Sequence, residues 1–157
     1  AADLEAERLF DEKGLDAFEE LLREKRAASA GTLAKADAEV LALEAEAGRR
    51  ADGWNVRRAD LDALKSRAEI AGEGAESIAL APRLEALTKE TAALEDAKKA
   101  AEKSLAAARA RRDDVRSPLD RLEAARARAL REVDLLDARY LLIGPTPANA
   151  VLSAPGL

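Results

Sequence analysis

The sequence predicts an all-α fold: an elongated coiled coil built as a long antiparallel helical hairpin, with an N-terminal helical segment and an extended C-terminal tail. Three observations predict it: a composition typical of long helices, two ladders of heptad-spaced residues, and a pair of glycines between the ladders. Of the 157 residues 48% are hydrophobic, mostly alanine, 36% are charged and only 3% are aromatic. Such a chain lacks the large side chains of a thick core but suits long paired helices.

The stronger ladder is an unbroken three-then-four spacing from Leu84 to Ile143. With Leu84 as heptad position a, every d position is apolar, and this repeat keeps one stripe facing a partner helix over about 90 Å of continuous helix. The a positions are Leu84, Thr91, Lys98, Leu105, Arg112, Leu119, Arg126, Val133 and Tyr140. The d positions are Leu87, Leu94, Ala101, Ala108, Val115, Leu122, Ala129, Leu136 and Ile143.

A weaker ladder begins at Leu33. Two of its d positions are arginine, Arg50 and Arg57, and many others are alanine. Asp52–Asn55 contains Asp-Gly turn chemistry, so a turn and a continuous helix both remain open there. The a positions are Leu33, Val40, Ala47, Trp54, Leu61, Ala68 and Ala75, and the d positions are Ala36, Leu43, Arg50, Arg57, Leu64, Ala71 and Ile78.

Residues 1–31 predict short N-terminal helices. Gly14 lies where a left-handed residue ends a helix. Asp16 and Glu19 are spaced as a capping box for a helix that starts at the next residue. The sequence Ser29–Thr32 then predicts a break before the coiled coil.

Residues 32–143 form the predicted hairpin, with a turn near residues 72–81. The two ladders are out of register by two residues, and Gly72 and Gly74 mark a turn between antiparallel helices more simply than a phase shift within one helix. Pro82 is then expected in the first turn of the second helix, where its missing N–H costs nothing.

Prolines predict two features of the C-terminal part of the chain: a kink in the second helix and an extended tail. Pro118 predicts a kink near residues 117–118 rather than a second hairpin, because the heptad phase continues through it. Residues 144–157 contain three prolines and no charged side chain, which predicts an extended tail. A frayed terminus and a docking peptide both remain open for this tail.

The charge distribution also predicts an antiparallel arrangement of helices, within one chain or between two chains. Residues 1–48 carry 6 basic and 13 acidic side chains, a net charge of −7, whereas residues 98–131 carry 11 basic and 5 acidic, a net charge of +6. Folding back at the glycines brings acidic and basic segments together, which biases register and direction.

The basic segment also permits a nucleic-acid interpretation, in which arginines line phosphates along a helix. Pairing with the acidic segment is favoured, because the whole chain has a net charge of −5 and the segment has no stacking aromatics. The arginines concerned are Arg109, Arg111, Arg112, Arg116, Arg121, Arg126, Arg128 and Arg131.

Catalysis is not expected. The chain has no histidine and no cysteine, which removes the commonest general base, thiol nucleophile and zinc ligands. Gly72–Gly74 lacks the continuation of a phosphate-binding loop. We expect no enzyme, no cofactor, no metal site and no small-molecule substrate. We also expect no transmembrane segment and no signal peptide, and place the chain in the cytoplasm or a virion.

The expected partners are proteins, including further copies of this chain, because a lone hairpin of this composition buries little apolar area. The predicted function is structural: a strut, spacer or adaptor subunit in a larger assembly, for example a virion fibre, neck or scaffold. Alternatives are a stalk subunit of a membrane complex, a nucleic-acid-associated coiled coil, and a regulatory module that sequesters a partner through the tail. The predicted partner-binding residues are Trp54, Tyr140, Leu142, Ile143, Val151, Leu152 and Leu157.

Overall fold

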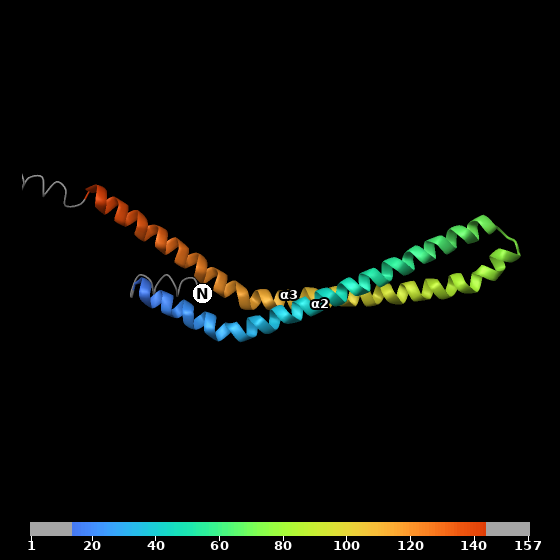
Figure 1. Ribbon diagram of the computed structural model, residues 1–157, viewed down its shortest axis with the longest axis horizontal. Coiled ribbons are helices and arrows are strands. Elements are labelled where there is room, and N and C mark those ends of the chain that lie inside the picture. The colour runs from blue at the N-terminus through green and yellow to red at the C-terminus, as the bar shows by residue number, and fades with distance from the viewer. Residues whose placement is uncertain (1–13, 144–157) are drawn as a thin grey trace, which may run out of the picture. The chain divides into compact units, whose positions relative to one another are not determined.

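The computed structural model describes residues 14–143, and the side chains of residues 14–136. Within this part the chain forms two helices, α2 (Leu15–Ala71) and α3 (Ala75–Ile143), and no strand. The two helices pack against each other, which confirms the all-α antiparallel helical hairpin (Figure 1). The helix predicted before Gly14 and the tail of residues 144–157 lie outside the described residues.

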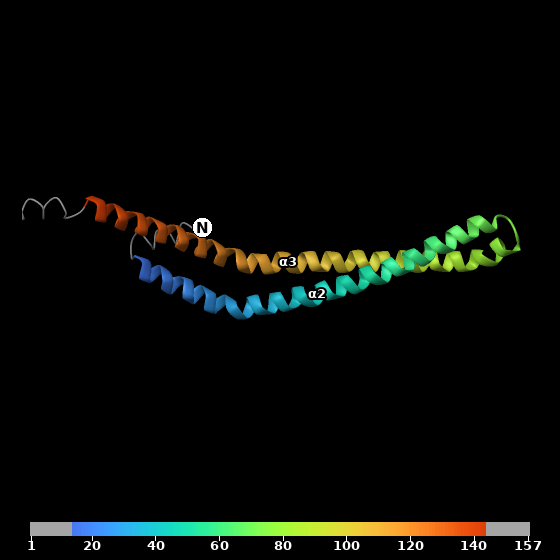
Figure 2. The same ribbon diagram turned by 45° about the horizontal axis from the view of Figure 1, so that its top comes forward.

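The chain divides into two units, each containing one segment of α2 and one of α3. The hairpin unit is Thr32–Asp114 and includes the turn. The end unit combines Ala1–Gly31 with Val115–Leu157. Within each unit the two helical segments lie side by side, as both views show (Figures 1 and 2).

The start of α2 differs from the capping-box prediction. Gly14 has a φ of 81°, the left-handed conformation expected of it, and its carbonyl accepts a hydrogen bond from the Phe18 amide at 3.4 Å. Asp16 therefore lies inside the first turn, where its charge suits the helix dipole, instead of preceding it. The Glu19 carboxylate binds Arg126 across the interface, so the predicted capping box is wrong.

Neither suspected interruption of α2 is present. The helix runs through Ser29–Thr32, where a break was predicted, and through Asp52–Asn55, where the sequence left a turn open. Turn propensities of this size, up to about 1 kcal/mol per glycine, are outweighed by packing of the neighbouring heptads.

The turn is shorter than the predicted span of residues 72–81. Gly72 has a φ of 63° and ends α2, and its amide donates to the Glu69 carbonyl at 3.3 Å. The Gly74 carbonyl accepts the Ser77 amide at 3.1 Å and so begins α3. Pro82 therefore lies inside α3, not in its first turn as predicted, and its exposed ring faces solvent.

Pro118 does not end α3, which is helical from Ala75 to Ile143. The chain therefore forms no second hairpin at Pro118, as the sequence predicted. The predicted kink near residues 117–118 stays a prediction.

The predicted seam of α3 is buried or half-buried at every a and d position from Leu84 to Val133. The same phase extends one heptad earlier, to half-buried Ser77 and buried Leu80. Leu136, a d position, is an exception with 62% exposure. The seam of α2 follows its predicted a positions from Leu33 to Ala68, which are all buried or half-buried.

The d positions of α2 behave less regularly. Arg50 and Arg57 are exposed at the edge of the interface and bind carboxylates, so their long side chains leave the seam. Ile78, assigned to this ladder by extrapolation across the turn, belongs to α3 and is 73% exposed. The heptad frame of α2 therefore stops at Ala71.

The end unit contains a contiguous cluster of buried apolar side chains. Phe18 and Leu22 of α2 pack with Leu122 and Ala125 of α3, and Phe18 is 2% exposed. In the hairpin unit the buried apolar residues are separate along the seam: Val40, Leu61, Leu64, Leu80 and Ala108.

Candidate functional site

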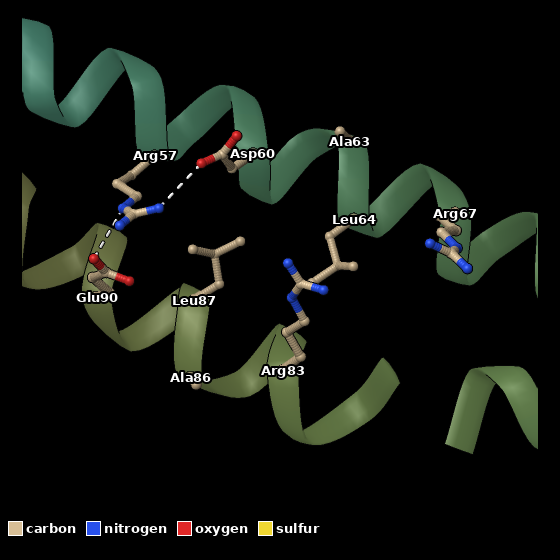
Figure 3. Close-up of a pocket in the computed structure, with 9 residues that line it drawn as sticks. All are labelled: Arg57, Asp60, Ala63, Leu64, Arg67, Arg83, Ala86, Leu87 and Glu90. Atoms are coloured by element: carbon tan, nitrogen blue, oxygen red, sulfur yellow. Dashed lines mark hydrogen bonds and ion pairs between the residues drawn. The ribbon is translucent and has the colours of Figure 1, made fainter. Parts of the chain in front are cut away.

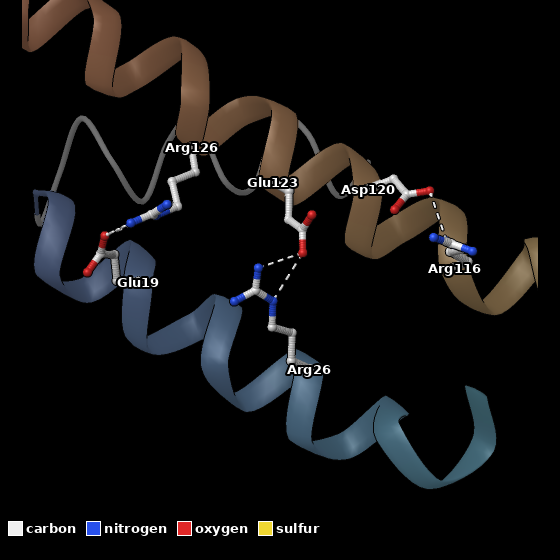
Figure 4. A network of polar contacts seen from close by, with 6 residues as sticks. All are labelled: Glu19, Arg26, Arg116, Asp120, Glu123 and Arg126. Carbon is white, nitrogen blue, oxygen red and sulfur yellow. Dashed lines mark hydrogen bonds and ion pairs between the residues drawn. The ribbon is translucent and has the colours of Figure 1, made fainter. Parts of the chain in front are cut away.

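The chemically distinctive part of each unit is the interface between its two helical segments. In the end unit, the Arg126 guanidinium donates to Glu19 Oε1 from Nη2 at 2.7 Å and from Nε at 3.0 Å (Figure 4). The Arg26 guanidinium donates in the same two-pronged way to Glu123 Oε1. Both bonds join α2 to α3, and their basic partners lie on opposite helices, so they favour one register of the two helices.

The hairpin unit has four comparable ion pairs between the helices. Their shortest nitrogen–oxygen distances lie between 2.6 and 2.9 Å. The pairs are Glu39 with Arg111, Glu44 with Arg109, Arg57 with Glu90, and Arg67 with Glu76. All of these side chains are partly exposed, so each pair contributes about 0–1 kcal/mol, but together they specify register.

The basic stretch of α3 is engaged as the charge distribution predicted. Acidic residues from the first 48 bind three of its arginines in the two units, and two more bind neighbouring aspartates on α3. The five paired arginines are Arg109, Arg111, Arg112, Arg116 and Arg126. An arginine already paired with a carboxylate is a weaker phosphate ligand, which reduces the support for the nucleic-acid interpretation.

Trp54 lies against α3 at the centre of the hairpin unit. Its half-buried ring is covered by the Lys98 ammonium, 4.3 Å from the ring centroid, in a cation–π contact. The indole Nε1 is buried and has no hydrogen-bond acceptor among the described residues. Trp54 is thus part of the seam, and its predicted role as a partner-binding residue remains a prediction.

A depression between α2 and α3 lies nearer the turn (Figure 3). Leu64 and Leu87 form its apolar part, and Arg57 bridges Asp60 of α2 and Glu90 of α3 at 3.2 and 2.9 Å. Arg83 extends across it below Leu64 (Figure 3). These groups can bind carboxylates and cover apolar surface, and they supply no nucleophile.

Intrahelical pairs alter the pKa values of three groups, the half-buried Glu46 and Glu95 and the exposed Lys99. Hydrogen bonds from Arg49 and Arg50 hold the pKa of Glu46 below its usual value of 4.5. The hydrogen bond between Lys99 and Glu95 lowers the pKa of Glu95 and raises that of Lys99. These shifts stabilise the charged forms of side chains on the helix surface.

The remaining predicted partner-binding residues lie near or beyond the end of α3. Tyr140, Leu142 and Ile143 belong to its last turns, and their side chains lie outside the described residues. The tail residues Val151, Leu152 and Leu157 lie outside the described residues altogether. No contact of these six is therefore established.

The sequence analysis missed a second apolar surface on α2, opposite the seam. Leu41, Val56 and Ile70 are 69%, 61% and 88% exposed. They lie at positions b and c of the same heptad frame, so extending that frame beyond a and d would have found them. We define the outer face of α2 as Ala38, Leu41, Ala45, Gly48, Asp52, Val56, Ala59, Ala63, Ser66 and Ile70, all exposed.

No group of three or more acidic side chains in residues 14–136 is placed to hold a metal ion. Neither α2 nor α3 contains an apolar stretch long enough to cross a membrane. Comparison with known protein families, curated proteins and solved structures finds no match for this chain.

Proposed function

We propose that this chain is a non-enzymatic structural coiled coil that acts as a strut, spacer or adaptor subunit in a larger assembly. The observation that carries the proposal is the way in which α2 and α3 are joined. Their contacts are repeated layers of buried apolar residues, mostly leucine, flanked by ion pairs such as Glu44–Arg109 that fix register. Such an interface maintains spacing and direction along its length.

The distribution of polar groups supports this proposal. Between the helices, arginine side chains bind glutamates, and the lysine at the centre covers a tryptophan ring. These basic side chains therefore contribute to holding the helices together. A spacer needs this arrangement, because its performance depends on length and register rather than on one reactive group.

A length change tests the proposal directly. One heptad with leucine at positions a and d is inserted after Ala71, and a matching heptad is inserted before Ala75. Each insertion adds about 10 Å of helix and preserves both heptad phases. The native assembly is captured from its source with the chain, and its components and their separation are measured by native mass spectrometry and electron microscopy.

A strut or spacer predicts an assembly of unchanged composition in which the components joined by this chain move apart by about 10 Å. The control variant carries the insertion in α2 alone, which leaves its added heptad unpaired and should not change the separation in the same way. An assembly of unchanged composition with an unchanged separation of components would contradict the proposal, and so would a chain that enters no assembly.

A further inference from the structure

We propose that the outer face of α2 binds a second copy of this chain, with the two α2 helices antiparallel and related by a two-fold axis that passes beside Asp52. The inference rests on the proposed structural role, and it specifies one contact by which the subunit assembles. All the residues it uses belong to the hairpin unit.

The outer face of α2 is unusually apolar for a surface opposite a coiled-coil seam. Positions on that side of a helix normally carry charged residues that face solvent. At the outer positions of α3 in the hairpin unit, exposed charged residues such as Glu85, Lys89 and Asp96 alternate with exposed alanines, and Ile78 is the one large apolar side chain. On α2 the ten residues of the outer face include one charge, Asp52, together with exposed Leu41, Val56 and Ile70. Nothing within the hairpin unit covers these three side chains.

This face is complementary to itself in size. In an antiparallel pair centred on Asp52, residues equally distant from Asp52 on opposite sides lie at the same height. Gly48 then lies opposite Val56, and Leu41 lies opposite Ala63. Each large side chain meets a small one, the arrangement by which facing helices interdigitate. Because the contact is isologous, each of these layers occurs twice.

The same axis makes the face complementary in charge. Lys35 and Glu69 are equally distant from Asp52 and therefore lie opposite each other, once on each side of the axis. Neither forms an ion pair with another described residue. The two Asp52 carboxylates approach each other at the axis, and their repulsion opposes part of the attraction between the two Lys35–Glu69 pairs.

Gly48 supplies a further argument. It lies within a helix, where glycine is unfavourable, and a Cβ added to it would meet nothing within 4 Å in the hairpin unit. The single chain therefore gives no steric reason for glycine at this position. Opposite Val56 of a second copy, the missing Cβ makes room for the larger side chain.

Cysteine cross-linking tests the antiparallel pairing cleanly, because the chain contains no cysteine. In the full chain, Asp52→Cys should form a disulfide-linked dimer on mild oxidation, since the two positions meet at the axis. Ser66→Cys should not, because its symmetry mate lies about 42 Å away in this register. Cross-linking at both positions would show a parallel pair, and cross-linking at neither would show no such contact. Either result overturns the proposal.

Sedimentation equilibrium of the full chain tests the energetics. Leu41→Glu should raise the dimer dissociation constant at least about tenfold, because it places a charge among apolar residues. Leu135→Glu is the matched control: Leu135 is similarly exposed, at 60%, but lies on α3. Equal effects of the two substitutions, or no effect of Leu41→Glu, would contradict the proposed surface.

A charge reversal tests the register. Lys35→Glu should weaken the dimer about tenfold, because two ion pairs become repulsive, and adding Glu69→Lys should restore it. Failure of the second substitution to rescue the first would contradict this register. The dimer and the proposed function can fail separately. If the chain is monomeric but paired heptad insertion still moves the assembly components apart, only the dimer is contradicted.

Discussion

The two units hold similar pairs of helices together in different ways. The end unit concentrates its cohesion in one cluster, in which Phe18 and Leu22 of α2 meet Leu122 and Ala125 of α3. The hairpin unit distributes its cohesion over single buried residues, the Trp54–Lys98 contact and four ion pairs between its helices. A chain poor in aromatic residues can therefore stabilise one region with a single large buried side chain, and another with many smaller contacts repeated along the helices.

The largest expected effect is at the centre of the cluster. Phe18→Ala should lower the free energy of unfolding of the end unit by about 3 kcal/mol, because Phe18 is almost completely buried. Urea denaturation and hydrogen exchange at end-unit amides measure it. Leu135→Ala, at an exposed site of the same unit, should change it by less than about 0.5 kcal/mol. Similar losses of unfolding free energy for both variants would show that the stability of the end unit is not concentrated in the Phe18 cluster.

In the hairpin unit, one close layer is expected to resist enlargement. Ala108 is 1% exposed at a d position, so Ala108→Leu should destabilise this unit by about 2 kcal/mol through overpacking. The neighbouring Ala107 is exposed, and Ala107→Leu should be close to neutral in the same thermal unfolding measurement. A stabilising Ala108→Leu substitution would show that the helices pack less closely there than the structure indicates.

A glycine-to-alanine substitution should lower the free energy of unfolding in the turn and raise it in the helix interior. Gly72 has a left-handed φ of 63°, so Gly72→Ala should cost about 1–2 kcal/mol. Gly53 is helical, and an added Cβ meets nothing, so Gly53→Ala should stabilise by about 0.5–1 kcal/mol. Chemical denaturation of the two variants measures both. A shared sign would contradict either the turn or the continuous helix.

The ion pairs between the helices should contribute less to the free energy of unfolding than the buried side chains, and by similar amounts in the two units. A double-mutant cycle on Glu19 and Arg126 in the end unit should give a coupling of about 0.5 kcal/mol, because both side chains are 42% exposed. Glu44 and Arg109 in the hairpin unit should give a comparable value. Both couplings should fall as salt is added. A coupling of several kcal/mol in only one unit would show that electrostatics distinguishes the units.

The smallest expected effect concerns pH. Because the pKa of Glu46 is lowered by Arg49 and Arg50, its ionised form stabilises the helix above the unfolded pKa, and this stabilisation is lost as the pH falls below about 4.5. The pKa of Lys99 is raised, so its contribution is lost only as the pH rises above 10.5. Far-UV circular dichroism should show a shallow acid loss of helix that Glu46→Gln reduces. A variant with an unaltered acid transition would contradict the Glu46 contribution.

The sequence was sufficient to predict the fold class and most of the α3 seam. Heptad periodicity is a physical requirement of helix pairing, so it appears in the residue order itself. Even the buried threonine of the seam, Thr91, fits its a position, because its hydroxyl donates to the Leu87 carbonyl at 2.7 Å. The opposed charges of the two segments similarly predicted an antiparallel arrangement, but they left open whether it lies within one chain or between two.

The local interruptions were harder to predict. The turn chemistry of Ser29–Thr32 and Asp52–Asn55 is a weak preference, and packing along a long helix outweighs it. The position of Pro82 depended on where α3 begins, which the Gly74 carbonyl determines through its bonds to the following amides. The candidate partner surface of α2 was missed because the search for apolar residues ended at positions a and d.

α2 and α3 of one chain pair antiparallel, which brings Glu39 close to Arg111. Spin labels at these two positions, in labelled chain diluted with unlabelled chain, give the distance within a single molecule by pulsed electron paramagnetic resonance. An antiparallel hairpin predicts a distance of about 20 Å or less, since packed helix axes lie about 8–10 Å apart. A distance near the roughly 108 Å expected for one uninterrupted helix across these 72 residues would contradict it.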